Sequence, residues 1–164
     1  MAVTLAQAIA QIGTVAANMS LVEQAALTVA AQMVQEEAQR VIGTYDYGWP
    51  PLAESTLKKK DADTPLLETG EMRDSIEYTV MRREAQVGSN NPKAVWQELG
   101  TKTIPPRSFL MGAAMHEENA IHQATGRIFH AALNFSAPFP YAHFSGMATP
   151  TVGPSLRRII PRGR

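Results

Sequence analysis

The sequence predicts an α+β fold: a small antiparallel β-sheet packed by two long α-helices, followed by an extended C-terminal arm. Two segments, one before residue 43 and one after residue 106, repeat apolar residues at helical spacing. Residues 75–80 alternate polar and apolar side chains, which is the period of a half-buried strand. Residues 136–164 hold five of the eleven prolines, which excludes helix over most of that segment. We therefore divide the chain into an α+β domain, 1–135, and an arm, 136–164.

The first helical region falls into two parts. Its first part carries an apolar face at helical spacing, formed by Leu5, Ile9, Ile12, Ala16 and Met19. Gly13 weakens this part, because glycine costs about 1 kcal/mol relative to alanine inside a helix. Ser20 stands three residues before Glu23, the pattern of a capping box at a helix start. We expect the main helix to span residues 20–42 and to end at Gly43.

Residues 44–63 have no clean period and predict an extended connection. Pro50 and Pro51 forbid a helix there, and neighbouring aromatic residues are expected to anchor the segment. A short basic run follows, formed by Lys58, Lys59 and Lys60. A solvated loop is the first interpretation of this run, and a nucleic-acid contact is the alternative.

A short helix and then a hairpin are expected next. Thr64 before Pro65 has the pattern of an N-cap followed by proline at the first helical position, which predicts a helix ending near Gly70. Residues 75–80 predict a strand, and residues 85–88 predict the returning strand. The apolar side of the first strand is formed by Ile76, Tyr78 and Val80.

The second long helix is expected after Pro105 and Pro106, with Ser108 as its cap. Its apolar stripe is formed by Leu110, Ala114, Ile121, Ile128, Ala132 and Phe135. Residues 94–99, between the hairpin and this helix, are too few to assign from periodicity.

Composition narrows the class of protein. The hydrophobic share of 45% in 164 residues is ordinary for one globular domain. No apolar run approaches the roughly eighteen residues of a membrane span, and no basic segment marks a signal peptide. The chain has no cysteine, so disulfides and thiolate metal sites are excluded.

The zero net charge hides an asymmetry between the two ends of the chain. Residues 1–118 carry ten Lys and Arg against fifteen Asp and Glu, a net charge of −5. Residues 119–164 carry five Arg and no acidic residue, a net charge of +5. Oppositely charged ends suit docking of the tail on a neighbouring copy, and a disordered basic tail is the alternative.

No catalytic motif is found. His116-Glu117 begins like the zinc-protease motif HExxH, but Ala120 stands where the second histidine is required. The glycines form neither a phosphate-binding loop nor a dinucleotide fingerprint, and no Gly-x-Ser-x-Gly segment occurs. We therefore predict neither an enzyme nor a protein with a cofactor or metal.

Segments between residues 49 and 110 nevertheless follow one another in a recognisable order. They are WPPL (49–52), STLKKK (55–60), TPLLETGEMRDSI (64–76), VGS (87–89), AVWQELGT (94–101) and IPPRSFL (104–110). In this order the sequence resembles the small neck proteins of tailed phages, also called tail-completion or virion-morphogenesis proteins. The resemblance covers the middle third of the chain. Where the family often has Tyr-Ala before Glu-x-Gly, this chain has Ala-Val-Trp.

The resemblance implies a structural virion protein that forms a ring in the neck and joins the head connector to the tail. The expected partners are other copies of the chain in a hexamer, with a dodecamer as the alternative, a head-closure or adaptor protein, and a tail terminator or tail tube. Genomic DNA would pass through the ring without sequence-specific contact, and no membrane is involved. The expected location is the virion neck, after assembly in the host cytoplasm. The resemblance also suggests a helical turn that places Trp96 against the sheet.

Interface residues are predicted in two regions. In the domain they are Trp96 and Arg107, whose guanidinium is expected to bond either backbone carbonyls or a neighbour's carboxylate. In the arm they are Phe139, Tyr141, Phe144, Arg157, Arg158, Ile159, Ile160, Arg162 and Arg164. The apolar members of the arm are expected to wrap a neighbour, and its arginines to face an acidic surface or DNA.

A second function remains open from the sequence. The lysine run 58–60 and the arginine-rich tail would also serve a small cytoplasmic nucleic-acid-binding module. In the neck interpretation the same lysines would face the DNA channel.

Overall fold

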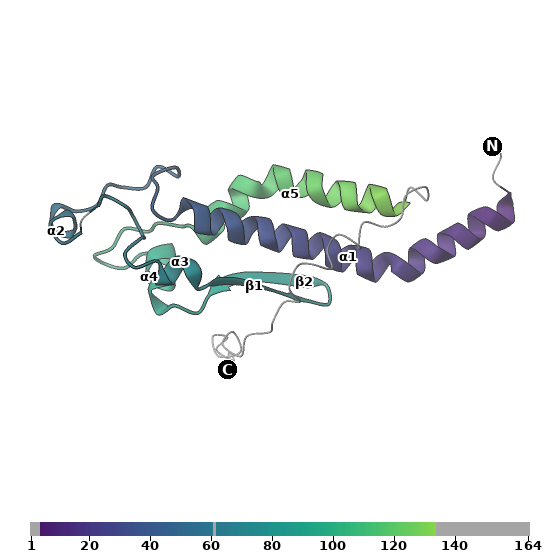
Figure 1. Ribbon diagram of the computed structural model, residues 1–164, viewed down its shortest axis with the longest axis horizontal. Helices are drawn as coiled ribbons and strands as arrows, with labels where there is room; N and C mark the ends of the chain where they lie inside the picture. Colours follow the sequence, from purple (N-terminus) through teal and green to yellow (C-terminus); the bar gives the residue numbers. More distant parts are fainter. Residues whose placement is uncertain (1–3, 61, 134–164) are drawn as a thin grey trace.

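A long central helix organises the computed structural model, which describes residues 4–60 and 62–133. Helix α1 (Leu5–Val41) forms the middle layer, and helix α5 (Leu110–Leu133) runs along one side of it. The hairpin lies along the other side of α1 (Figure 1). The predicted α+β fold class, with a small antiparallel sheet and two long helices, is confirmed. Phe135 and the predicted arm lie outside the described residues.

Helix α1 is continuous across the point where a new helix start was expected. Its N-cap is Thr4, which forms a capping box with Gln7. Ser20 lies inside the helix, so the predicted start at residue 20 is wrong. The cap at Thr4 already opens the helix, and extending an existing helix adds one hydrogen bond per residue without a second nucleation cost.

Helix α1 bends by 41° between Leu5–Thr14 and Ala16–Val41 (Figure 1). Gly13 lies next to the bend, and the Thr14 hydroxyl donates to the Ala10 carbonyl, a contact that often bends helices. In the part of the chain that the structure describes, no single helix is long and apolar enough to cross a membrane. The two parts of α1 meet that criterion only when taken together as a bent pair.

The C-terminal end of α1 follows the sequence prediction. The helix ends at Val41, and Gly43 takes a φ of +97°, in the left-handed region. The Gly43 amide donates to the carbonyl of Pro65 at 2.8 Å. A Cβ at Gly43 would lie 3.2 Å from a methyl carbon of Leu67, so the glycine also permits close packing of the next segment.

The helix expected after Thr64 does not form. The segment turns at Pro65 and Leu66, and Leu66 has a φ of +65°. The carbonyls that a helix would use are occupied by other donors: Lys60 Nζ binds those of Thr64 and Leu67, and the Gly43 amide binds that of Pro65. Two single-turn helices flank the segment, α2 (Glu54–Leu57) and α3 (Glu71–Asp74).

The predicted hairpin is confirmed. Strands β1 (Ile76–Met81) and β2 (Glu84–Ser89) pair antiparallel, and their register runs from Ile76 opposite Ser89 to Met81 opposite Glu84. At its open end the Ser75 and Ser89 hydroxyls lie 2.6 Å apart.

Two glutamines of α1 hold the hairpin. The side-chain amides of Gln35 and Gln39 donate to the Ile76 carbonyl, at 2.7 and 3.3 Å. The first residue of β1 is therefore tied to the central helix by polar contacts as well as by burial.

One hydrophobic cluster joins these elements. Its buried members are Ala38, Val41, Ile42, Trp49, Met72, Ile76, Ala94, Phe109 and Ala113. Phe109, directly before α5, is fully buried and is the largest of the fully buried side chains. This position makes it the main apolar link between α5 and the rest of the core.

The Phe109→Ala substitution should lower the free energy of unfolding by about 3–5 kcal/mol, because it leaves a cavity in a packed core. Urea denaturation of the purified protein measures this change. Phe129→Ala is the matched control. Because Phe129 of α5 is 37% exposed, this variant should lose much less of the free energy of unfolding. Equal losses for the two variants would contradict the assignment of Phe109 to the core.

Candidate functional site

The N-terminus of α5 is capped by a carboxylate from another helix. Glu98 belongs to α4 (Pro92–Leu99) and accepts hydrogen bonds from the amides of Phe109, Leu110 and Met111 at 2.8–3.0 Å. These amides would otherwise lack partners, and a negative charge at this end is favoured by the helix dipole. One side chain thus joins two elements about ten residues apart in the sequence.

Ser108 does not cap α5 itself, which corrects the sequence prediction. Its hydroxyl donates to Glu98 Oε1 at 2.5 Å. A carboxylate offers two acceptor oxygens and a full charge, so it satisfies more amides than one hydroxyl can. The glutamate of the Glu-x-Gly-Thr segment, Glu98, therefore caps a helix that begins twelve residues later in the sequence, at Leu110. The spacing of residues in the sequence does not reveal this contact.

The loop between α4 and α5 requires glycine at position 100. Gly100 has a φ of +74°, and a Cβ there would lie 2.9 Å from the Pro106 nitrogen and 3.0 Å from the Ile104 oxygen. The Thr101 amide donates to the Ile104 carbonyl at 2.9 Å. This tight turn returns the chain so that residues 107–111 meet Glu98.

Arg107 is buried within its own chain, with 6% of its surface exposed. Its amide donates to the Gln97 carbonyl at 2.7 Å, and one terminal guanidinium nitrogen donates to the Pro50 carbonyl at 3.0 Å. Its Nε has no hydrogen-bond partner among the residues that the structure covers. Of the two contacts expected for this guanidinium, the structure shows the one to a backbone carbonyl. An interface role for Arg107 stays a prediction.

The outer side of α4 is apolar and exposed. Asn91 caps the helix, Ala94 is turned into the core, and Trp96 is 52% exposed. The expected helical turn is present as α4, but Trp96 is not part of the hydrophobic cluster, because the small residue Ala94 takes the inward position. Val95 and Leu99 are exposed as well. We call these three exposed side chains, Val95, Trp96 and Leu99, the α4 face.

Lys58, Lys59 and Lys60, which were predicted to face the DNA channel, differ in their exposure and contacts. Lys58 and Lys59 are exposed, whereas the Lys60 ammonium binds the carbonyls of Thr64 and Leu67 and so holds a turn in place. A cleft of about 320 Å³ adjoins this region, lined by lysines and by acidic residues such as Glu68 and Glu71. The mixed charge of this lining gives no preference for an anion such as phosphate.

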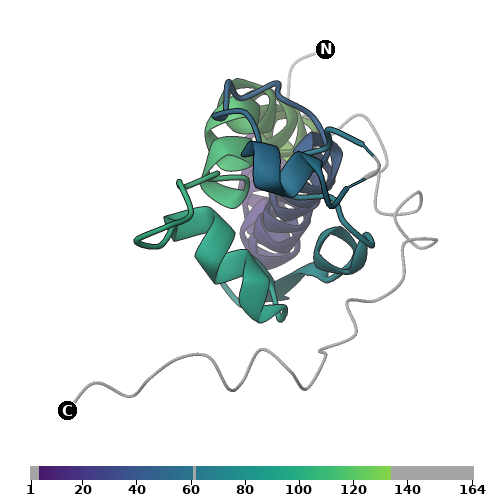
Figure 2. The same cartoon turned by 90° about the vertical axis from the view of Figure 1, so that its left-hand side faces the viewer.

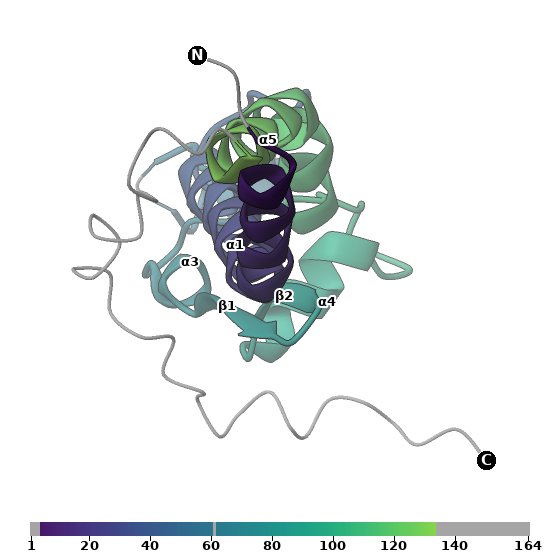
Figure 3. The same cartoon turned by 90° about the vertical axis from the view of Figure 1, so that its right-hand side faces the viewer.

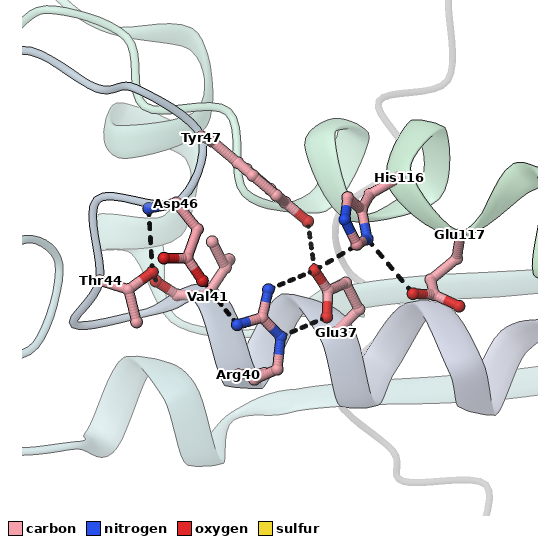
Figure 4. Close-up of polar contacts among 8 residues, drawn as sticks. All are labelled: Glu37, Arg40, Val41, Thr44, Asp46, Tyr47, His116 and Glu117. Carbon is pink, nitrogen blue, oxygen red and sulfur yellow. Dashed lines mark hydrogen bonds and ion pairs between the residues drawn. The ribbon is translucent and has the colours of Figure 1, made fainter.

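A polar cluster between α1 and α5 was not anticipated from the sequence (Figure 4). Its centre is Glu37, a buried residue of α1 whose two oxygens bind the Arg40 guanidinium at 2.6 and 2.8 Å. Tyr47 donates to Glu37 at 2.9 Å, and the His116 ring nitrogen of α5 lies 3.2 Å from it. Arg40 also binds Asp46 at 2.6 Å. Only Glu37 and Arg40 are close enough in sequence to be paired by spacing.

Hydrogen bonding and burial shift the pKa values of Glu37 and Tyr47 in opposite directions. The hydrogen bond from Arg40 lowers the pKa of Glu37 below its ordinary 4.5, while burial opposes the change. Burial, followed by the hydrogen bond to Glu37, raises the pKa of Tyr47. Glu37 therefore stays ionised and Tyr47 stays neutral around neutral pH, as their hydrogen bond requires.

Glu37, His116 and Glu117 offer ligand atoms within 4.8 Å of one another, a spacing that a metal ion could use. Both oxygens of Glu37, however, already accept from Arg40. A cation would have to displace that charge-assisted pair, so the arrangement fits a structural ion network better than a metal site.

The predicted interface residues of the arm lie outside the described residues, from Phe139 to Arg164. Comparison with known proteins does not identify a family. No protein-family model, no curated protein and no solved structure matches this chain. The resemblance to phage neck proteins therefore rests on the sequence segments that carry it.

The Glu98→Ala substitution should lower the free energy of unfolding by about 2–3 kcal/mol, because several charge-assisted hydrogen bonds at the start of α5 are lost together. Urea denaturation measures the change. Glu77→Ala, at an exposed position of β1, is the control and should change stability little. A loss below about 0.5 kcal/mol for Glu98→Ala would show that the cap is dispensable.

Acid should destabilise the protein partly through Glu37. Its pKa is lowered by folding, so its stabilisation is present above its ordinary value of 4.5 and is lost as the pH falls through the folded-state pKa. In Glu37→Gln the melting temperature should therefore fall less steeply than in the wild type between pH 5 and pH 2. Glu36→Gln, at the exposed neighbouring position, is the control. Parallel profiles for Glu37→Gln and the wild type would contradict this role.

Proposed function

We propose that this chain is a structural subunit of a tailed-phage neck, where copies form a ring that joins the head connector to the tail. Its partners in this proposal are further copies of itself, a head-closure or adaptor protein and a tail terminator or tail tube. The DNA that passes through the ring is not read by sequence. The subunit contributes surfaces rather than chemistry.

The observation that carries this proposal is where the segments of the resemblance lie in the fold. The segments beginning at residues 49, 64, 94 and 104 each supply a buried residue to the hydrophobic cluster described above. These residues are Trp49, Met72, Ile76, Ala94 and Phe109. The same segments supply Glu98 and Arg107, which fix the α4–α5 junction. Segments that resemble one family in order thus build one core, as expected if they specify that family's fold.

Exposed apolar surface also supports an assembly role. The α4 face carries a tryptophan flanked by two aliphatic residues, and tryptophan is enriched among residues that dominate binding energy. Scattered single apolar residues are normal on a protein surface, whereas large contiguous apolar patches mark interaction sites. A ring subunit needs such surfaces on two sides.

The lysines give the nucleic-acid-binding alternative less support. Lys60 is bound to backbone carbonyls, which leaves Lys58 and Lys59 as exposed cations of the run. Two lysines on one turn are few for a DNA-binding surface, which generally neutralises several phosphates.

Electron microscopy of a phage in which this gene is disrupted tests the proposal. We expect DNA-filled heads and separate, unjoined tails, and we expect a wild-type copy supplied in trans to restore joined virions. A complementing copy that carries Glu77→Ala serves as the matched control for expression. Intact virions from the disrupted phage would overturn the proposal. A salt-dependent mobility shift with short duplex DNA would then favour the nucleic-acid-binding module.

A further inference from the structure

The first half of α1 extends beyond the hairpin, and before its bend it also extends beyond the end of α5 (Figure 1). Val22 is the first residue along α1 that is buried, among those whose side chains are described. Beside it, Arg83 at the hairpin turn binds Glu23 at 2.9 Å, so the hairpin ends at this level of the helix. The helix from Leu5 to Leu21 continues for roughly 25 Å past that point, at 1.5 Å per residue.

This projecting half of α1 carries an apolar seam that no other described residue covers. Leu5, Ile9 and Ile12 are 78%, 62% and 66% exposed, and Met19 continues the same side. Their spacing alternates between four and three residues, as in the seam of a coiled coil, which fits against another helix. The chain has no Asp, Glu, Lys or Arg from Leu5 to Val22, so burying this surface would remove no charge from water.

The α4 face lies at the opposite end of the molecule. In Figure 1 the free end of α1 is at the right-hand end of the long axis, and helix α4 lies in the left-hand part of the molecule, next to α3. Figure 2 shows α4 towards the viewer, and Figure 3 shows the free half of α1 towards the viewer from the other end. Val95 and Leu99 are one helical turn apart and so share a side of α4. The projecting seam cannot reach this face in its own molecule.

We propose that the projecting half of α1 in one copy docks on the α4 face of a second copy. The inference rests on the proposed ring and adds the contact through which neighbouring subunits meet. A ring closes through heterologous contacts, in which two different surfaces of the same chain meet. The chain offers these two surfaces, both apolar, both helical and at opposite ends. Trp96 is the central anchor of the contact, and Leu5, Ile9 and Ile12 pack around it.

A membrane surface is a poorer partner for the seam. Helices that lie on membranes generally carry Lys or Arg on the polar face and Trp or Phe on the apolar face. Residues 5–21 contain none of these four residue types. The polar side of this half of α1 instead carries amides and hydroxyls, which suit contact with protein as well as with water.

Cysteine cross-linking tests the contact, and the chain suits it because it has no native cysteine. Ile9→Cys and Leu99→Cys are prepared as full-length single-cysteine proteins, one with an added tag that changes its mass. The two are mixed and treated with a short bismaleimide, both as purified proteins and in virions that contain both variants. Glu77→Cys replaces Leu99→Cys in the control mixture, because Glu77 is exposed on the hairpin. Unchanged melting temperatures establish that the variants fold.

The expected product is the mixed dimer of Ile9→Cys and Leu99→Cys, absent from the control mixture. Adding Trp96→Gln to the Leu99→Cys protein should reduce its yield about tenfold or more, the loss typical of a central aromatic anchor. Dimers of Ile9→Cys alone would overturn the proposal in favour of paired α1 helices. Virions without the mixed dimer would overturn it as well, while leaving the neck function in place.

A second measurement distinguishes the α4 face from two other possible partners of the seam, a lipid surface and the arm. The double substitution Leu5→Gln and Ile12→Gln, added to the Ile9→Cys protein, should abolish the mixed dimer. It should not change flotation with phosphatidylcholine vesicles, which we expect to be negligible with and without it. If the wild type floats with the vesicles and the double variant does not, the proposal is overturned and the seam is assigned to a lipid surface. Cross-links of Ile9→Cys that disappear on removal of residues 136–164 would overturn it in favour of the arm.

Discussion

A single carboxylate fixes where α4 ends and where α5 begins, and the layered arrangement of the protein follows from that junction. Glu98 satisfies three amides at the start of α5, and the Gly100 turn brings them within its reach. The start of α4 is tied to the hairpin, because the Asn91 amide donates to the Ser89 hydroxyl. The hairpin and α5 lie on opposite sides of α1. Helix α4 and the loop after it connect them, and so help to set their positions.

Helix α1 combines a packed half and a free half, and the packed half makes the free one stable. Short isolated helices are marginal in water because forming the first turn is costly. Residues 22–41 are held by α5 and the hairpin and supply that nucleus. The projecting half then needs only propagation, which its alanine content and the Thr4 cap favour. The projecting half of α1 is thus helical without a hydrophobic core of its own.

The sequence predicted those parts of the fold whose cause is local. The strand alternation at Ile76 and the glycine at position 43 depend on near neighbours, and both predictions are confirmed. The helix expected after Thr64 does not form, because Lys60 and Gly43 bind its carbonyls, and the Gly43–Pro65 hydrogen bond spans too many residues for a local pattern to show it. The polar cluster around Glu37 was missed for the same reason, since His116 reaches it only through the packing of α5 on α1.

Burial separates two kinds of aromatic residue within the segments that resemble neck proteins. Trp49 and Phe109 are buried in the monomer, so packing in their own chain accounts for their presence. Trp96 is half exposed although it lies between the buried Ala94 and the capping Glu98, on a helix whose position is fixed. An exposed tryptophan on a rigid helix loses little conformational entropy when a partner covers it, because its backbone is already held in place. The described residues therefore leave Trp96 half uncovered, which is why we propose that a second copy of the chain covers it.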